Sequence, residues 1–203
     1  MQGLALKNVA IKVVDTKTKK EVYRDMGEML FTHFGVSGPM ILSASSHLRN
    51  MEKGRYQILV DMKPALSAEQ LDSRILRDFS ENNNKNFINS LGGLLPRKMI
   101  PVVVKLSGIR PTEKVNQITK EQRARLITVL KEFKVTVNDF SSIKDAIITS
   151  GGVKVSEINP KTMESKLIKN LYFAGEVIDV DAYTGGFNLQ IAFSTGHLAG
   201  ENM

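Results

Sequence analysis

The chain has 203 residues and no cysteine, which excludes disulfides, thiolate metal sites, iron–sulfur clusters and cysteine nucleophiles within it. Hydrophobic residues make up 42% and charged residues 24%, the usage of an ordinary globular protein. No apolar run approaches the roughly 20 residues that a membrane-spanning helix needs, and the first residues lack the pattern of a signal peptide. These features predict a cytoplasmic protein without membrane contacts.

The net charge of +7 is concentrated in one segment. Residues 95–134 contain ten basic and three acidic side chains, so the remainder of the sequence is balanced. A basic surface of this kind attracts phosphates or carboxylates, but a solvated helical surface or a face against an acidic partner domain would also explain it. The ten basic residues are Arg97, Lys98, Lys105, Arg110, Lys114, Lys120, Arg123, Arg125, Lys131 and Lys134.

The first 63 residues have mainly the pattern of β-strands. Polar and apolar positions alternate loosely over 4–14, and a polar turn at 15–20 then predicts a hairpin. Pro39 suits the first turn of a helix, where its missing N–H costs nothing. The predicted elements are strands at 4–14, 21–24 and 27–32, a helix at 40–51 and a strand at 56–62.

Two capping boxes predict helices in the middle of the chain. Ser67 is followed three residues later by Gln70, and Thr119 by Gln122, so each pair can satisfy the first free N–H groups of a helix. We expect helices at 67–80, 87–91, 96–107 and 119–132, with Asn82, Asn83 and Asn84 ending the first, and a strand at 133–140. The predicted organisation is a β insert domain at 1–63 and 133–150, with a helical basic subdomain at 64–132 nested in it.

The last 50 residues have a different pattern. Residues 170–175 form a short apolar run that ends at a glycine, which predicts a strand buried on both faces. A glycine-containing loop and a helix at 188–199 follow, with Leu189, Ala192, Phe193 and Ala199 along one face. A strand, a glycine loop and a helix N-terminus in succession suit an anionic or electron-rich ligand.

Residues 175–190 hold the densest group of candidate ligand-binding residues. Carboxylates just past a buried strand, here Glu176 and Asp179, can accept hydrogen bonds from ligand hydroxyls. Gly185 and Gly186 let the backbone approach a planar ligand, and the N–H groups of 188–190 would point at its electron-rich edge. The same spacing is also compatible with an acidic surface turn that binds nothing.

Two long motifs occur in order along the chain. The first is Gly27–Pro39 (GEMLFTHFGVSGP). The second consists of Gly151–Val153, Thr162–Lys166, Leu171–Glu176, Asp179 and Thr184–Gln190. Together they closely resemble the BaiN/RdsA-type NAD(P)/FAD-dependent oxidoreductases, also described as aminoacetone-oxidase-like flavoproteins, and the resemblance covers essentially the whole chain.

The resemblance implies that this chain is the second part of a larger flavoprotein. Members of that family open with a Rossmann-like half whose G-x-G-x-x-G motif holds the FAD pyrophosphate, and this sequence has no such motif. The expected fold is α+β: a β-barrel-like insert domain, its nested helical subdomain, and residues 151–203 as the C-terminal strand/helix segment of a Rossmann-like FAD domain. The missing N-terminal FAD-binding half is then a required partner, and this chain alone should hold FAD weakly and be inactive.

The resemblance also assigns cofactor-binding residues. Glu176 and Asp179 would lie near the ribityl chain of FAD, with Asp179 the better candidate for a ribityl hydroxyl. The segment 185–190 would approach the pyrimidine edge of the isoalloxazine ring. The complete predicted set is Gly152, Gly175, Glu176, Asp179, Thr184, Gly185, Gly186, Asn188, Leu189 and Gln190.

The function implied by the resemblance is flavin-mediated hydride transfer, with NAD(P)H as the electron donor. The substrate stays open among small metabolites, steroid-like enones and RNA bases. The alternative is a non-enzymatic nucleic-acid-binding module that contacts RNA through residues 95–134, with Arg123 and Arg125 among its contacts.

Other catalytic constellations are weaker. His33 is a candidate catalytic residue, because the resemblance places its loop near the boundary of the insert and flavin domains, but a histidine between phenylalanines is also a common structural residue. The histidines show no metal-ligand spacing, so no metal site is predicted. Ser37, Asp179 and His197 follow the order of one hydrolase triad, but Pro39 stands where the G-x-S-x-G elbow has glycine.

Overall fold

The computed structural model describes all residues, 1–203, and divides them into two compact units. Unit 1 consists of residues 1–44 and 50–139, and unit 2 of residues 45–49 and 140–203. Each unit is described by itself. None of the helices is long and apolar enough to cross a membrane.

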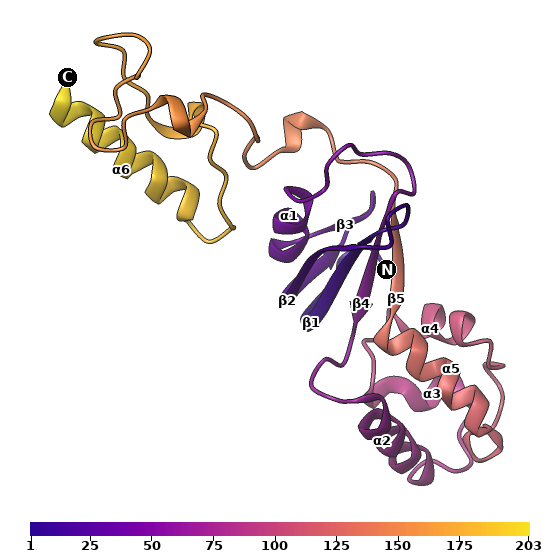
Figure 1. Ribbon diagram of the computed structural model, residues 1–203. Coiled ribbons are helices and arrows are strands. Elements are labelled where there is room, and N and C mark those ends of the chain that lie inside the picture. Colours follow the sequence, from indigo (N-terminus) through magenta and orange to yellow (C-terminus); the bar gives the residue numbers. More distant parts are fainter. The chain divides into compact units, whose positions relative to one another are not determined.

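Unit 1 is built on one antiparallel sheet that curls into an open half-barrel (Figure 1). The strand order is β3-β2-β1-β4-β5. The predicted strands at 21–24 and 27–32 are in fact one strand, because the pairing of β2 with β1 continues through Gly27. The strands are β1 (Leu4–Asp15), β2 (Glu21–Phe31), β3 (Val36–Ser37), β4 (Tyr56–Asp61) and β5 (Phe133–Val137).

One face of the sheet is the core of the half-barrel. Alternate residues of the strands are buried on this face, as period-2 patterning requires; they include Ile11, Val13, Met29, Ile58 and Val60. Helix α1 (Pro39–Ser45) starts at the proline as predicted but ends six residues before the predicted end. It ends there because Leu48 N–H donates to the Ser45 carbonyl in a three-residue turn.

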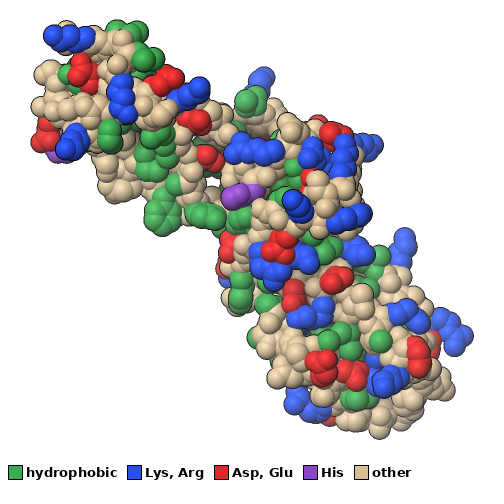
Figure 2. Space-filling view, viewed as in Figure 1, with side chains coloured by type: hydrophobic (Ala, Val, Ile, Leu, Met, Phe, Trp, Pro, Cys, Tyr) green, Lys and Arg blue, Asp and Glu red, His purple; other side chains and the backbone are tan.

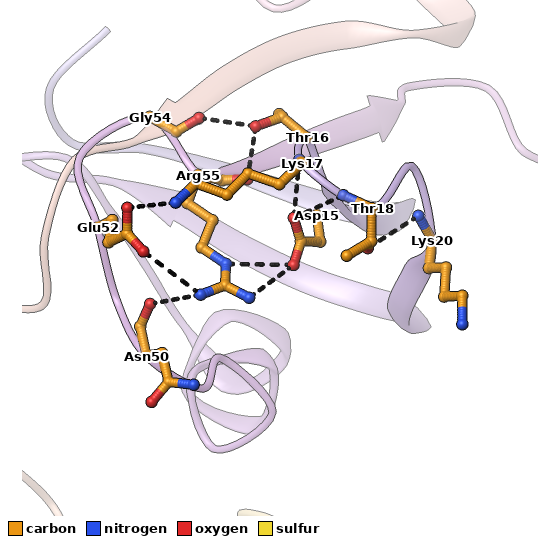
Figure 3. A network of polar contacts seen from close by, with 9 residues as sticks. All are labelled: Asp15, Thr16, Lys17, Thr18, Lys20, Asn50, Glu52, Gly54 and Arg55. Carbon is orange, nitrogen blue, oxygen red and sulfur yellow. Dashed lines mark hydrogen bonds and ion pairs between the residues drawn. The ribbon is translucent and has the colours of Figure 1, made fainter.

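A polar network holds the β1–β2 turn against the segment that precedes β4 (Figure 3). Asp15 is buried and accepts hydrogen bonds from the Arg55 guanidinium (3.0 and 3.1 Å) and from the backbone N–H of Lys17 and Thr18. Burial alone would raise the pKa of the Asp15 carboxyl, but the hydrogen bonds from Arg55 and the two N–H groups outweigh burial and lower it. Asp15 is therefore ionised and paired at neutral pH.

The helical part of unit 1 lies between β4 and β5 in the sequence (Figure 1). Both predicted capping boxes are formed: Ser67 and Thr119 accept from the N–H of Gln70 and Gln122, whose side chains accept from the cap residues. The third helix starts at Ile100 rather than at 96, because Pro101 is tolerated only in a first turn. The helices are α2 (Ala68–Ser80), α3 (Phe87–Ser90), α4 (Ile100–Ser107) and α5 (Lys120–Lys131), with short 3-10 turns η1 (Leu91–Gly93) and η2 (Val115–Gln117).

Unit 2 contains one long helix, α6 (Phe187–Asn202), and the 3-10 turns η3 (Ile143–Asp145), η4 (Val155–Glu157) and η5 (Gly175–Val177). The strand predicted at 170–175 is wrong for this chain. The segment forms a single isolated bridge, between Tyr172 and Glu164, because no extended neighbour lies beside it to continue a ladder. The core of unit 2 is small and consists of Ile158, Met163, Ile178 and Ala199.

Helix α6 packs through only two of the four residues predicted to line its packed face. Ala199 is buried, and Ala192 is half-buried beside Gly175. Leu189 and Phe193, which were expected on the same face, are 62% and 68% exposed. The helix is apolar on more than one side, so periodicity alone could not identify the packed side.

Candidate functional site

Gly152 brings two segments of unit 2 into direct backbone contact. Val153 N–H donates to the Val177 carbonyl (2.8 Å), and Asp179 N–H donates to the Val153 carbonyl (2.9 Å). Gly152 has a φ of +146°, and a Cβ there would lie 2.4 Å from the Val177 oxygen. Only glycine fits at this position. The predicted site residues Gly152 and Asp179 are therefore brought close together.

The turn η5 contains Glu176, Asp179 follows it by two residues, and the turn is attached to α6. Gly175 N–H donates to Thr195 Oγ1 (3.0 Å), which donates to the Ile191 carbonyl in the helix. The Glu176 carboxylate accepts hydrogen bonds from the N–H (2.7 Å) and the hydroxyl (3.1 Å) of Thr149. The Asp179 carboxylate is exposed and makes no hydrogen bond within the chain. Asp179 is thus the carboxylate available to a ligand hydroxyl.

Sequence reasoning missed Thr149 and Thr195. Thr149 is 27 residues from Glu176, and Thr195 is 20 residues from Gly175. Isolated threonines at such separations give no sequence signal, because nothing local indicates what they will contact.

The glycine loop and the start of α6 form the second half of the site. Gly185 and Gly186 have φ angles of +119° and +93°, and Gly186 is the N-cap of α6 without a side chain to cap it. Asn188 closes the loop: its Oδ1 accepts from Ala182 N–H (2.9 Å) and its Nδ2 donates to the Ala182 carbonyl (3.0 Å). Asn188 therefore positions the loop with its side chain. The Thr184 side chain is half-buried there and makes no hydrogen bond.

Three N–H groups at the start of α6 have no acceptor within the chain. They belong to Phe187, Asn188 and Leu189. The N–H of Gln190, predicted to be free, instead donates to the Gly186 carbonyl (2.9 Å), because it is the first N–H that the helix itself can satisfy. No acidic side chain lies in this first turn, so the positive end of the helix dipole is uncompensated.

The other sequence candidates lie elsewhere or are engaged. His33 is exposed in the tight turn between β2 and β3, where its ring packs edge-on against Phe34 at 4.9 Å. His197 pairs with Glu201 on the same helix (3.3 Å). No cluster of three metal-ligating side chains is present.

Comparisons with known proteins agree over most of the chain. Residues 1–148 match the family model described as an HI0933-like protein barrel and H2TH domain. The chain is 32% identical over 194 residues to 3-dehydro-bile acid delta(4,6)-reductase of Clostridium scindens, a match that covers 93% of this chain and 47% of that protein.

Two further relatives are named ribosomal RNA dihydrouridine synthase. The one from Escherichia coli is 30% identical over 198 residues, with 98% of this chain and 47% of the relative covered. The one from Haemophilus influenzae is 31% identical over 171 residues, with 84% and 40% covered. The chain spans about half the length of the first two relatives and less of the third.

Proposed function

Because this chain belongs to the HI0933-like family of BaiN/RdsA-type flavoproteins, we propose that it is part of an FAD-dependent oxidoreductase and that unit 2 supplies one wall of the flavin site. The observation that carries the proposal is the start of α6. Three N–H groups without acceptors follow two glycines of positive φ, and the turn with the predicted carboxylates packs on the same helix.

The residues of this wall fit a flavin in their chemistry. Gly185 and Gly186 have no side chains to hinder a planar ring. The free N–H groups and the positive end of α6 suit the pyrimidine edge, which becomes negatively charged when flavin is reduced. Asp179 would accept a hydrogen bond from a ribityl hydroxyl, with Glu176 near the same chain and Gly152 near the ring. When bound, FAD supplies the hydride transfer, so the protein needs no nucleophile of its own.

The rest of the proposed flavin site belongs to a larger protein. We propose that the Rossmann-like half, with its G-x-G-x-x-G motif, covers unit 2 and supplies the strand neighbours that residues 170–175 lack. Three large apolar side chains of α6, Phe187, Leu189 and Phe193, are 59–68% exposed in unit 2 and would be covered in this way. The domain organisation predicted from the sequence is part of this proposal.

The names of the relatives guide the proposal for the reaction. One name describes a bile acid reductase and the other a dihydrouridine synthase. Reduction of a carbon–carbon double bond would account for both names. We therefore propose a hydride transfer of this type, with NAD(P)H as the electron donor, on either a small-molecule enone or an RNA base.

Visible absorption spectra test the flavin proposal. The protein extended by the coding sequence upstream of Met1 should be yellow as purified, and the 203-residue chain should be colourless. In the extended protein, Asp179→Ala should weaken FAD retention on gel filtration, whereas Asp181→Ala, a neighbouring exposed carboxylate without an assigned role, should leave it unchanged. If both forms are colourless and added FAD binds to neither, the proposal is wrong.

RNA is the second candidate partner, supported by the names of two relatives. Two of the ten basic residues in the predicted segment 95–134, Arg123 and Arg125, make contacts inside unit 1. Arg123 is 13% exposed and donates to Asp72 on α2 (2.8 Å), and Arg125 donates to the Ser107 carbonyl at the end of α4. Substitution of these arginines would test the packing of α5, so an RNA-binding test needs other residues.

A further inference from the structure

Two loops of the helical part of unit 1 are tied together into one surface. They are residues 81–86, between α2 and α3, and residues 108–119, between α4 and α5. Lys114 Nζ donates to the Asn84 carbonyl (2.8 Å), and Val115 N–H donates to the Lys85 carbonyl (3.2 Å). An isolated bridge pairs Asn86 with Lys114. The loops therefore hold a fixed position on the buried side chains of Phe87 and Val115.

The exposed side chains of this surface are amides and cations. Neither loop exposes a large hydrophobic side chain. The residues that define the two-loop surface are Asn83, Asn84, Lys85, Arg110, Lys114 and Asn116, all exposed. Figure 2 shows basic side chains at the rim of the helical part, with acidic and apolar side chains on the same face.

The acidic side chains near this surface compensate little of its charge. Glu113 is only 9% exposed, and its carboxylate accepts hydrogen bonds from Gln122 (2.8 Å) and Arg110 (3.4 Å). The Arg110 side chain is itself 82% exposed, so this ion pair contributes little and leaves the guanidinium accessible. Lys85 has no carboxylate partner; the exposed acids are Glu81 in the first loop and Glu121 just after the second.

The other cations of the helical part differ in their contacts. Lys131 pairs with Asp61 (2.6 Å) and donates to the Leu66 carbonyl (2.7 Å), and Lys98 donates to the Gln2 carbonyl (2.9 Å). Arg123 and Arg125 also make contacts within the fold, whereas Arg97, Lys105 and Lys120 are exposed. In the two-loop surface, exposed cations occur together with exposed amides.

We propose that the two-loop surface docks helical RNA. Lysine and arginine bind phosphates, and asparagine amides can both donate to and accept from the 2′-hydroxyls and base edges of an A-form minor groove. Single-stranded RNA is usually bound by stacking on exposed aromatic side chains, and protein partners favour aromatic residues as well. This surface has no exposed aromatic side chain. The inference rests on RNA as a partner of the proposed oxidoreductase, and it does not require the flavin to be bound.

Fluorescence anisotropy with the 203-residue chain and a labelled 16-base-pair RNA duplex tests the proposal. Lys85→Glu with Arg110→Glu should weaken binding about tenfold at moderate salt and should reduce the slope of log affinity against log salt by about 2. The matched control is Lys20→Glu with Lys53→Glu, which makes the same charge change on exposed lysines in the loops that flank the sheet. It should change affinity less than about twofold.

A second variant separates amide contacts from charge. Asn83→Ala with Asn116→Ala should weaken RNA binding and leave the salt slope unchanged, because no cation is removed. It should also reduce the preference for RNA over a DNA duplex of the same sequence, which lacks the 2′-hydroxyl. Circular dichroism melts check that each variant is folded.

Several results would overturn the proposal. The first two are that the control pair weakens RNA binding as much as the loop pair does, or that the loop variants bind RNA with unchanged affinity. The others are that the chain binds the DNA duplex equally well, that it binds single-stranded RNA more tightly, or that poly-glutamate at the same charge concentration displaces the RNA. The outcome is independent of the visible spectrum of the extended protein. RNA docking and the flavin function can thus fail separately.

Discussion

Unit 1 and unit 2 differ in how completely each buries its own apolar side chains. In unit 1 the half-barrel and four capped or closely packed helices enclose residues such as Val13, Val60, Leu71 and Leu126, which are fully buried. In unit 2 only Ile158, Met163, Ile178 and Ala199 are buried, and α6 leaves Phe187, Leu189 and Phe193 exposed. Unit 1 is therefore stabilised by its own contacts, whereas unit 2 leaves an apolar surface that the proposed Rossmann-like half would cover.

The two units also differ in charge. Unit 1 has 22 basic and 14 acidic side chains, a net charge of +8, whereas unit 2 has 6 and 7, a net charge of −1. Unit 1, which buries its own core, therefore also has the positive charge that attracts polyanions. Unit 2 is nearly neutral and contains the residues of the proposed cofactor wall. Three predictions test this comparison.

The largest effect is expected in the core of unit 1. Leu126 on α5 is fully buried, so Leu126→Ala removes apolar contacts and leaves a cavity. We expect a loss of about 2–5 kcal/mol in the free energy of unfolding, measured by urea denaturation followed by circular dichroism. The control, Leu189→Ala on the exposed side of α6, should change it by less than about 0.5 kcal/mol. Equal losses would contradict the claim that the two helices differ in burial.

An intermediate effect is expected at the backbone contact of unit 2. Gly152→Ala combines an unfavourable φ with a Cβ 2.4 Å from the Val177 carbonyl oxygen, so the two backbone segments that are in contact must move apart. Backbone strain of this kind costs about 1–3 kcal/mol. Hydrogen exchange of the Val153 and Asp179 amides should become faster, while amides of unit 1 stay unchanged.

Gly151→Ala is the control for that substitution. Gly151 also has a positive φ, +103°, but a Cβ there would meet no neighbouring atom. Hydrogen exchange should accelerate less than in Gly152→Ala, because Gly151→Ala introduces backbone strain without a steric clash. Identical exchange in both variants would show that the close contact is unimportant.

The smallest effect is expected from acid. The pKa of Asp15 is lowered in the folded chain, so its ionised form stabilises unit 1 above the ordinary aspartate pKa of about 3.9. This contribution is lost as the pH falls through the lowered pKa. Melting temperatures measured from pH 7 to pH 2 should fall less steeply for Asp15→Asn, which should already be less stable at pH 7. The same acid slope in both proteins would contradict the assigned network.

Local sequence signals predicted much of unit 1 and little of unit 2. The caps at Ser67 and Thr119 were predicted correctly because a capping box is complete within four residues. The strand at 170–175 was wrong, because a ladder needs a neighbour that no local pattern specifies. In the candidate site, Gly185 and Gly186 have positive φ angles, and the N–H of Gln190, which was predicted to be free, is used within α6.

The sequence by itself determined the absence of thiol chemistry, the total charge, the starts of the two helices with capping boxes and, through two long motifs, the family. Each of these is read from residue identity or from residues a few positions apart. The tertiary structure decided which cations stay exposed, since Arg123 and Lys85 look alike in the sequence and differ in whether a carboxylate lies across from them. It also decided which side of α6 is packed. Both depend on contacts between residues far apart in the chain, which form only when burial brings those segments together.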